Sequence, residues 1–452
     1  MNRLNELEKM STLKSILIFS LPSIVALVLE SITAIVDTAF AGNIGGSSTY
    51  ALSAMGALSP IMTMLIAIQL LFGLSTGILV SRSIGEGDKE KSVKIFKIGY
   101  FLTIITSIVV SLLIFIFMDH ILTLLGATGE VFILAKEYLF IALFSNVFSS
   151  VGYMLVNIIR SIGYPKMEMI ICIVATLLNI ILNTLFTIVF KMGMTGIALA
   201  TLSSEILYLL WSIIYLKKMK FYFSPLKPSI KENKQISITL FKIGFVQFFL
   251  QAMLSLTSSL TNISLISYGS ISDLAVRAVL FSTLTMLIMP LAGLSQGIQN
   301  ILSFFVGRGN TKKVYDVLKC SIIISFIYGI VAYLLIGIKP SLIISIFTSS
   351  SQVIALSSSI MTLFLITFPL SGVFYILITY MQVAEKEADA MKLTVLKQVL
   401  LYLPLILILP IIFNKFPLGL TPSQSVFLAT PIADSIIILI SLMYLYKASK
   451  SL

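Results

Sequence analysis

The residues of this chain best placed to do chemistry are two carboxylates, Glu30 and Asp37, inside the apolar segment 13–40. They are seven positions apart, so in a helix they lie on nearly the same face, with Thr33 between them. A charged side chain in the bilayer core costs a few kcal/mol and usually marks a functional site. This stripe predicts a site for a cation or a proton, and Pro22 below it is a candidate hinge. Alternatively, Glu30 or Asp37 lies at the lipid headgroups or is protonated and only packs, and Pro22 is a proline that the helix tolerates.

The composition indicates a polytopic membrane protein. The chain has 452 residues, of which 58% are hydrophobic and 11% charged, with a mean hydropathy of +1.05. Twelve apolar segments are long enough to cross a bilayer. These are 13–40, 51–80, 95–118, 131–158, 167–190, 195–216, 238–265, 274–305, 317–338, 352–382, 389–413 and 423–446. We expect the first to be a retained span and not a signal peptide, because it continues past the length of a signal core.

The net charge of +12 is explained by topology. If the N-terminus is cytoplasmic, basic residues concentrate in and beside the inner loops, and only five of the 31 lysines and arginines fall outside. Those five are Lys136, Lys191, Arg277, Lys339 and Lys415. This asymmetry predicts a multi-pass protein of the cell membrane with both termini in the cytoplasm. It also favours attraction to anionic lipid headgroups over binding of nucleic acid.

Other chemistries have little support in the sequence. Cys172 and Cys320 lie in apolar segments without metal-ligand spacing, so we expect neither a disulfide nor a structural metal. His120 follows Asp119 at the end of a span and fits an interfacial cap better than a proton shuttle. The sequence has no P-loop, GxSxG or HExxH motif. We therefore expect no enzymatic activity and no cofactor apart from a coupling ion.

An internal repeat predicts the architecture. The motif G-L-S-x-G-I begins at Gly73 and again at Gly293, and a glycine-rich turn and a basic patch follow each copy. Six spans separate the copies, so both halves have the same orientation and form a parallel repeat. The predicted fold is an all-α polytopic bundle with two six-helix lobes, residues 1–216 and 238–452. Residues 217–237 are a cytoplasmic linker, and a central cavity is expected between the lobes.

Further polar groups of the first lobe lie on its fifth and sixth spans. Asn179 and Asn183 are four residues apart on one face, and so are Thr201 and Glu205. Together with Asp37 they offer carboxylate, amide and hydroxyl oxygens, which suit Na⁺, and carboxylates that can take up protons. Ordinary hydrogen bonding between membrane helices is the alternative interpretation.

The second half carries fewer acids. Its seventh span has Gln247, Gln251 and Asn262 but no carboxylate, and the tenth has none before Glu385 in a loop. Asp434 is the only carboxylate well inside this half, and the sequence leaves its role open. We therefore expect the cation site in the first lobe.

Several stretches resemble the multidrug and toxic compound extrusion (MATE) family of transporters. They are LPSIVALVLESITAIVDTAFAGNIG, LGATGEVFILAKEYLFI, NIIRSIGYPK, GMTGIALATLSSEILYLL and GLSQGIQNILSFFVGRGN, in this order over nearly the whole chain. The resemblance implies a two-lobe bundle of twelve helices that exports bulky, amphipathic, often cationic compounds by alternating access, in exchange for Na⁺ or H⁺.

The resemblance also implies a cation site. Bacterial and archaeal members place it on residues that match Asp37, Asn179 and Thr201 here. At Asn183 this chain departs from the many relatives that have aspartate, and Glu30 or Glu205 can compensate for the lost charge. The span 7 glutamate and span 10 aspartate of another branch have no counterpart.

Two other functions compete with drug export. A flippase for lipid-linked saccharides of the same broad superfamily would need cations in its cavity for the pyrophosphate. The charges placed inside the membrane are acidic, and Lys136, Lys397 and Arg277 are expected near span ends. A receptor would bind without flux. We expect small amphipathic substrates and no obligate protein partner.

Overall fold

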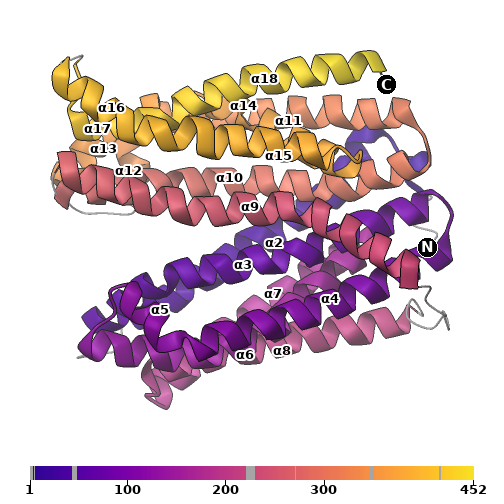
Figure 1. The fold of residues 1–452 in the computed structure, drawn as a ribbon, viewed down its shortest axis with the longest axis horizontal. Helices are drawn as coiled ribbons and strands as arrows, with labels where there is room; N and C mark the ends of the chain where they lie inside the picture. The colour runs from indigo at the N-terminus through magenta and orange to yellow at the C-terminus, as the bar shows by residue number, and fades with distance from the viewer. Residues whose placement is uncertain are drawn as a thin grey trace. The chain divides into compact units, whose positions relative to one another are not determined.

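The computed structural model describes residues 4, 6–42, 48–219, 230–269, 271–346, 351–416 and 419–451. In that part of the chain the secondary structure is helical, without strands (Figure 1). Residues 220–229 of the predicted linker lie outside the described residues.

The helices of the first half follow the apolar segments. Short η1 (Glu6–Glu8) precedes α2 (Thr12–Ala41), α3 (Ser48–Gly85), α4 (Lys89–Ile116), α5 (Met118–Leu124), α6 (Gly129–Ser161), α7 (Pro165–Asn183), the π-helix η3 (Thr184–Val189) and α8 (Gly193–Lys218). Capping sets some of the boundaries: the side chain of Asp88 accepts a hydrogen bond from the backbone N–H of Lys91 and starts α4. Helix α2 runs unbroken through Pro22.

The second half repeats this pattern with more interruptions. Its helices are α9 (Ile230–Tyr268), α10 (Ile271–Gly307), α11 (Thr311–Ile338), α12 (Pro340–Ile344), α13 (Ser351–Phe364), α14 (Phe368–Val383), α15 (Glu387–Val395), the π-helix η4 (Leu396–Tyr402), α16 (Leu403–Lys415), α17 (Pro422–Ser425), η5 (Val426–Leu428) and α18 (Ala429–Ser451).

The number of apolar helices confirms a polytopic α-helical membrane protein. Among the described residues, eleven helices are long and apolar enough to cross a bilayer, or twelve if the pair α13 and α14 forms one span. The span predicted over 352–382 consists of two helices, α13 and α14, which meet at a bend of 56°. Pro369, the second residue of α14, explains the break, since proline lacks the N–H and disfavours helix at the residue before it.

The chain divides into two compact units. The first unit is Met1–Gln251 with Ser303–Gly309, and the second is Ala252–Leu302 with Asn310–Leu452. In the first unit α3 packs on α6 and α4, α6 packs on α8, and α2 packs on α7; in the second, α14 packs on α11 and α18. Each unit has its own buried apolar core, around Leu139 in the first and Phe364 in the second. The predicted lobe limits at 216 and 238 stay a prediction.

Two glycines of the first unit form a close helix crossing. A Cβ added to Gly85, at the end of α3, would lie 2.2 Å from the carbonyl oxygen of Phe304. A Cβ added to Gly307, at the end of α10, would lie 2.2 Å from the carbonyl oxygen of Arg82. Gly307 follows Gly85 by 222 residues and Phe304 follows Arg82 by the same 222, so equivalent residues of the two repeats meet and the crossing is reciprocal. Only glycine permits two backbones to approach this closely.

Candidate cation and substrate site

A cavity of about 620 Å³ lies inside the first unit. Residues from α2, α3, α6, α7 and α8 line it. Its acidic side chains are Glu30, Asp37 and Glu205, and the described lining includes no lysine or arginine. The rest is a mixture of hydroxyl groups, methionines, tyrosines and small apolar side chains. A cavity of this kind holds a drug-sized molecule with apolar surface and a positive charge.

Asp37 is the centre of a hydrogen-bonded network at one wall of this cavity. Its Oδ1 accepts a hydrogen bond from Asn183 Nδ2 at 2.8 Å, and its Oδ2 accepts one from Thr201 Oγ1 at 2.8 Å. Asn183 Nδ2 also donates to Asn179 Oδ1 at 3.0 Å, and Asn179 Nδ2 donates to Thr201 Oγ1 at 3.2 Å. The structure thus brings together the four residues that the sequence and the resemblance selected for a cation site.

The network leaves one ligand atom unused. Asn183 Oδ1 is buried and has no hydrogen-bond partner among the described residues. A buried amide oxygen without a partner lowers the stability of the folded protein, and a bound cation would offset that cost. Asp37 is only 4% exposed and both asparagines are fully buried, so water supplies little competing solvation. The carboxylate, amide and hydroxyl oxygens of this network are hard ligands suited to Na⁺, and the carboxylate of Asp37 can also take up a proton.

Local geometry explains how these side chains meet. On α7, the four-residue spacing of Asn179 and Asn183 puts both on the face toward α2. The π-helix η3 begins directly after Asn183, and such wide turns often occur at functional sites. One turn away, Thr33 Oγ1 donates to Thr176 Oγ1 at 3.3 Å and joins α2 to α7 a second time.

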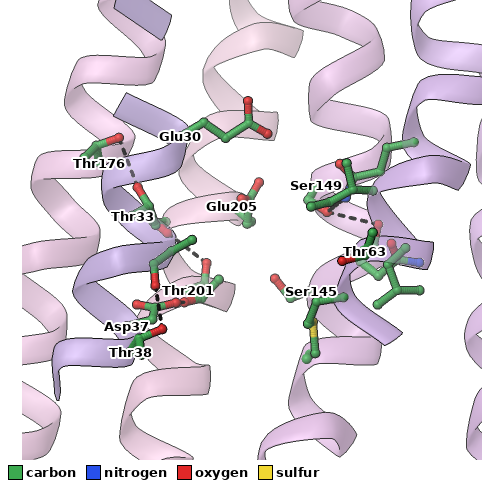
Figure 2. Close-up of a pocket in the computed structure, with 18 of the residues that line it drawn as sticks. Glu30, Thr33, Asp37, Thr38, Thr63, Ser145, Ser149, Thr176, Thr201 and Glu205 are labelled. Carbon is green, nitrogen blue, oxygen red and sulfur yellow. Dashed lines mark hydrogen bonds between the residues drawn. The ribbon is translucent and has the colours of Figure 1, made fainter. Parts of the chain in front are cut away.

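Glu30 and Glu205 differ from Asp37 in having no partner. Figure 2 shows both side chains pointing into the cavity, on the side of α2 and α8. Among the described residues neither makes a hydrogen bond or an ion pair. They are two carboxyl groups that, when ionised, can bind a cationic substrate or a coupling ion.

The opposite wall contains polar groups that the sequence reading missed. Ser145 and Ser149 on α6 face the cavity across from Asp37 (Figure 2). Ser149 Oγ accepts a hydrogen bond from Gln69 Nε2 of α3 at 2.7 Å. The sequence did contain a signal for them, because two serines four residues apart in an apolar helix lie on one face and indicate a polar surface there.

A buried ion pair at another part of the first unit was also missed. Arg160 Nη1 lies 2.8 Å from Glu168 Oε1, and the side chains are 1% and 6% exposed. Ser23, directly after Pro22, accepts a hydrogen bond from Arg160 at 3.2 Å and donates one to Glu168 at 3.4 Å. The sequence reading did not anticipate a buried arginine at this end of α6. The pair anchors α2 beside its proline to α6 and α7.

The second unit treats its interior carboxylate differently. Asp434 Oδ1 on α18 lies 2.8 Å from Lys397 Nζ on η4, and the side chains are 11% and 14% exposed. The sequence placed Lys397 near a span end; in the structure it is the second residue of η4, and its side chain lies in the interior of the unit against Asp434 of α18. Arg277 of α10 donates to Ser258 Oγ at 2.6 Å and stacks on Phe281.

No cluster of three or more His, Cys, Asp or Glu residues suited to a metal ion occurs in the described ranges. Cys172 and Cys320 are free thiols, and Cys172 lines the cavity.

Comparisons with known proteins agree with the fold and the repeat. The MatE family model matches residues 22–185 and again residues 245–408. The "Multidrug export protein MepA" of Staphylococcus aureus is 26% identical over 445 residues, which cover 97% of this chain and 94% of that protein.

Two solved structures share the fold. One is described as the outward-facing conformation of a multidrug resistance MATE family transporter of the MOP superfamily, with a TM-score of 0.90, 19% identity and coverage of 100% and 98%. The other is a MOP superfamily transporter from Pyrococcus furiosus, whose reversed pocket polarity is said to suggest a different function; its TM-score is 0.87, with 19% identity and 99% coverage of both chains. The two family matches together span more than half of the sequence and lie on both repeats, so this chain belongs to the MatE family.

Proposed function

We propose that this protein exports amphipathic, often cationic, drugs or toxic compounds across the cell membrane in exchange for Na⁺ or H⁺. Membership of the MatE family and the likeness to a multidrug export protein support export of small molecules. The observation that carries the coupling is the Asp37 network, a buried carboxylate with an unused amide oxygen beside it, at the wall of an acidic cavity.

The proposed mechanism is alternating access with competition for negative charge. A cationic substrate entering the cavity is held by Glu30 and Glu205 together with the apolar lining. When Na⁺ or a proton then neutralises Asp37, the cavity attracts the substrate less, and the substrate leaves toward the outside. The two occupants oppose each other because they require the same negative charge.

Helix α2 is the proposed moving part. It carries Glu30 and Asp37, and Pro22 near its start removes one backbone hydrogen bond of the helix. The ion pair of Arg160 and Glu168 holds the adjacent Ser23. We infer that α2 bends between Ser23 and the Asp37 network when that network changes its occupant.

The remaining features follow from the same proposal. Both termini are cytoplasmic, the coupling ion is the only cofactor, and the protein needs no obligate partner. The chain performs transport and no covalent chemistry.

Efflux of a fluorescent lipophilic cation from proteoliposomes tests the function, with an imposed Na⁺ gradient and, separately, an imposed pH gradient. Wild type should respond to one of them, and Asp37→Asn should not. Thr184→Val serves as the control, because Thr184 is next to Asn183 but is exposed, donates to the backbone of Ile180 and does not line the cavity. If neither gradient drives efflux by wild type, the antiporter is refuted for this substrate class, and flipping of a lipid-linked saccharide becomes the next assay.

A further inference from the structure

The sixth and twelfth spans share a local sequence that aligns Glu205 with Asp434. Leu199-Ala200-Thr201 in α8 reappears as Leu428-Ala429-Thr430 at the start of α18, and an acid follows each threonine after four residues. Ala200 and Ala429 are both fully buried. The two helices therefore place an equivalent carboxylate in the interior of each unit.

The fifth and eleventh spans align Ala175 with Lys397. Each span follows a turn residue with positive φ, Gly163 at 97° and Glu385 at 58°. Counting twelve residues from each turn leads to Ala175 in α7 and Lys397 in η4. Ala175 lines the cavity of the first unit. The second unit thus has a lysine where the first has a methyl group.

The hydrogen bonds support this correspondence. In the first unit Asn179 on the fifth span donates to Thr201 on the sixth. In the second unit Thr430 Oγ1 lies 3.5 Å from the hydroxyl of Tyr402 on the eleventh span. Equivalent pairs of spans are therefore joined in both units, by an amide in the first and a phenol in the second, although Tyr402 lies one residue beyond the position that aligns with Asn179.

The ammonium of Lys397 lies in surroundings suited to a cation. Its Nζ is 2.8 Å from Asp434 Oδ1, 4.3 Å from the ring centroid of Phe374 and 5.8 Å from that of Tyr375. A carboxylate together with aromatic faces is the arrangement that binds free ammonium ligands. Here the ammonium belongs to the chain itself.

We propose that Lys397 is a tethered cation that occupies a second cation site, at Asp434. The coupling ion of the first unit must arrive and leave, whereas this ammonium cannot leave, so Asp434 is neutralised throughout the cycle. The second unit consequently takes up no ion of its own. The inference deepens the proposed function, because it explains why coupling is confined to the first unit.

Removal of the tether should open this site to free cations. In full-length protein carrying Asp37→Asn, which silences the first site, we compare Lys397→Ala with Lys397→Ala/Asp434→Asn. The readout is the thermal unfolding midpoint in NaCl, or in ethylammonium chloride, against choline chloride at equal ionic strength. Lys397→Ala should gain a cation-dependent rise of about 2–4 °C. The rise should vanish when Asp434 is also changed.

Equal midpoints of these two variants in all three salts would overturn the proposal and leave Lys397 a structural partner only. Lys397→Arg keeps a tethered charge and should show no gain. If Lys397→Ala does not fold, Lys397→Gln and Lys397→Gln/Asp434→Asn replace the pair, since glutamine retains a donor toward Asp434. The cation-dependent rise is compared between variants that all carry Asp37→Asn, so this test does not depend on the role of Asp37. The efflux assay with wild type and Asp37→Asn tests the coupling proposal separately.

Discussion

The cavity of the first unit and the interior of the second unit treat their carboxylates in opposite ways. The cavity of the first unit exposes Glu30 and Glu205 without partners and gives Asp37 only neutral donors. The interior of the second unit pairs its carboxylate, Asp434, with Lys397. An unpaired buried acid costs stability but can bind an ion that comes and goes, whereas a paired one is satisfied and inert. The comparison indicates that the absence of a fixed counter-charge, and not burial alone, distinguishes the carboxylates of the cavity from Asp434.

The largest effect should come from breaking the pair of the second unit on one side. Asp434→Asn leaves the ammonium of Lys397 buried without a counter-charge, which costs about 3–5 kcal/mol. Glu205→Gln, at the equivalent position of the first unit, removes an unpaired charge and should not destabilise the protein. Denaturation in detergent, followed for both variants, measures this. Equal losses for the two would remove the distinction between the interiors.

The reverse experiment makes the first unit resemble the second. Ala175→Lys places an ammonium at the position that Lys397 has in the second unit, facing the acidic cavity. The cavity then carries its own cation, and gradient-driven efflux should fall about a hundredfold. Ala175→Met supplies similar length without charge and should retain most of the flux. Retention of full flux by the lysine variant would contradict the repeat register.

A smaller change sharpens the site itself. Asn183→Asp adds a second carboxylate beside Asp37, and two close carboxylates repel unless a cation separates them. If the gradient experiment identifies Na⁺ as the coupling ion, its concentration for half-maximal efflux should fall about tenfold, equivalent to about 1.4 kcal/mol. Asn183→Leu, which removes the unused amide oxygen, should raise it. If both variants shift in the same direction, Asn183 is not a ligand.

The smallest effect is expected at an exposed ion pair. Lys136 Nζ lies 2.6 Å from Asp119 Oδ1, but the side chains are 47% and 64% exposed. Lys136→Met should cost less than about 1 kcal/mol of unfolding free energy, because solvent and salt screen the pair. The same denaturation series measures it beside Asp434→Asn. A cost as large as that of Asp434→Asn would show that burial does not govern these pairs.

The sequence could predict the fold class and the members of the Asp37 network, but not all of their relations. Helical periodicity places Asp37, Asn179 and Thr201 each on one face of its own span, whereas only the tertiary structure shows that these faces meet. Pro369 alone did not predict the break between α13 and α14, because α2 continues through Pro22.

The ion pairs were harder to predict, since their partners lie on different elements. Arg160 and Glu168 stand on either side of a turn between two spans, and Lys397 and Asp434 are far apart along the chain. The shared Leu-Ala-Thr was a usable signal for Asp434. Lys397 lies in the π-helix η4, an element that no residue pattern predicted.

The crossing of Gly85 and Gly307 limits how such a duplicated chain can evolve. At each glycine a carbonyl oxygen of the other repeat occupies the space that a Cβ would need. An alanine at either site must therefore displace the backbone of the other repeat. Selection can therefore change the interior of one copy, for instance by giving an unpaired carboxylate a lysine partner, while the crossing of Gly85 and Gly307 stays symmetric. Ion stoichiometry can then diverge by single substitutions, without a new fold.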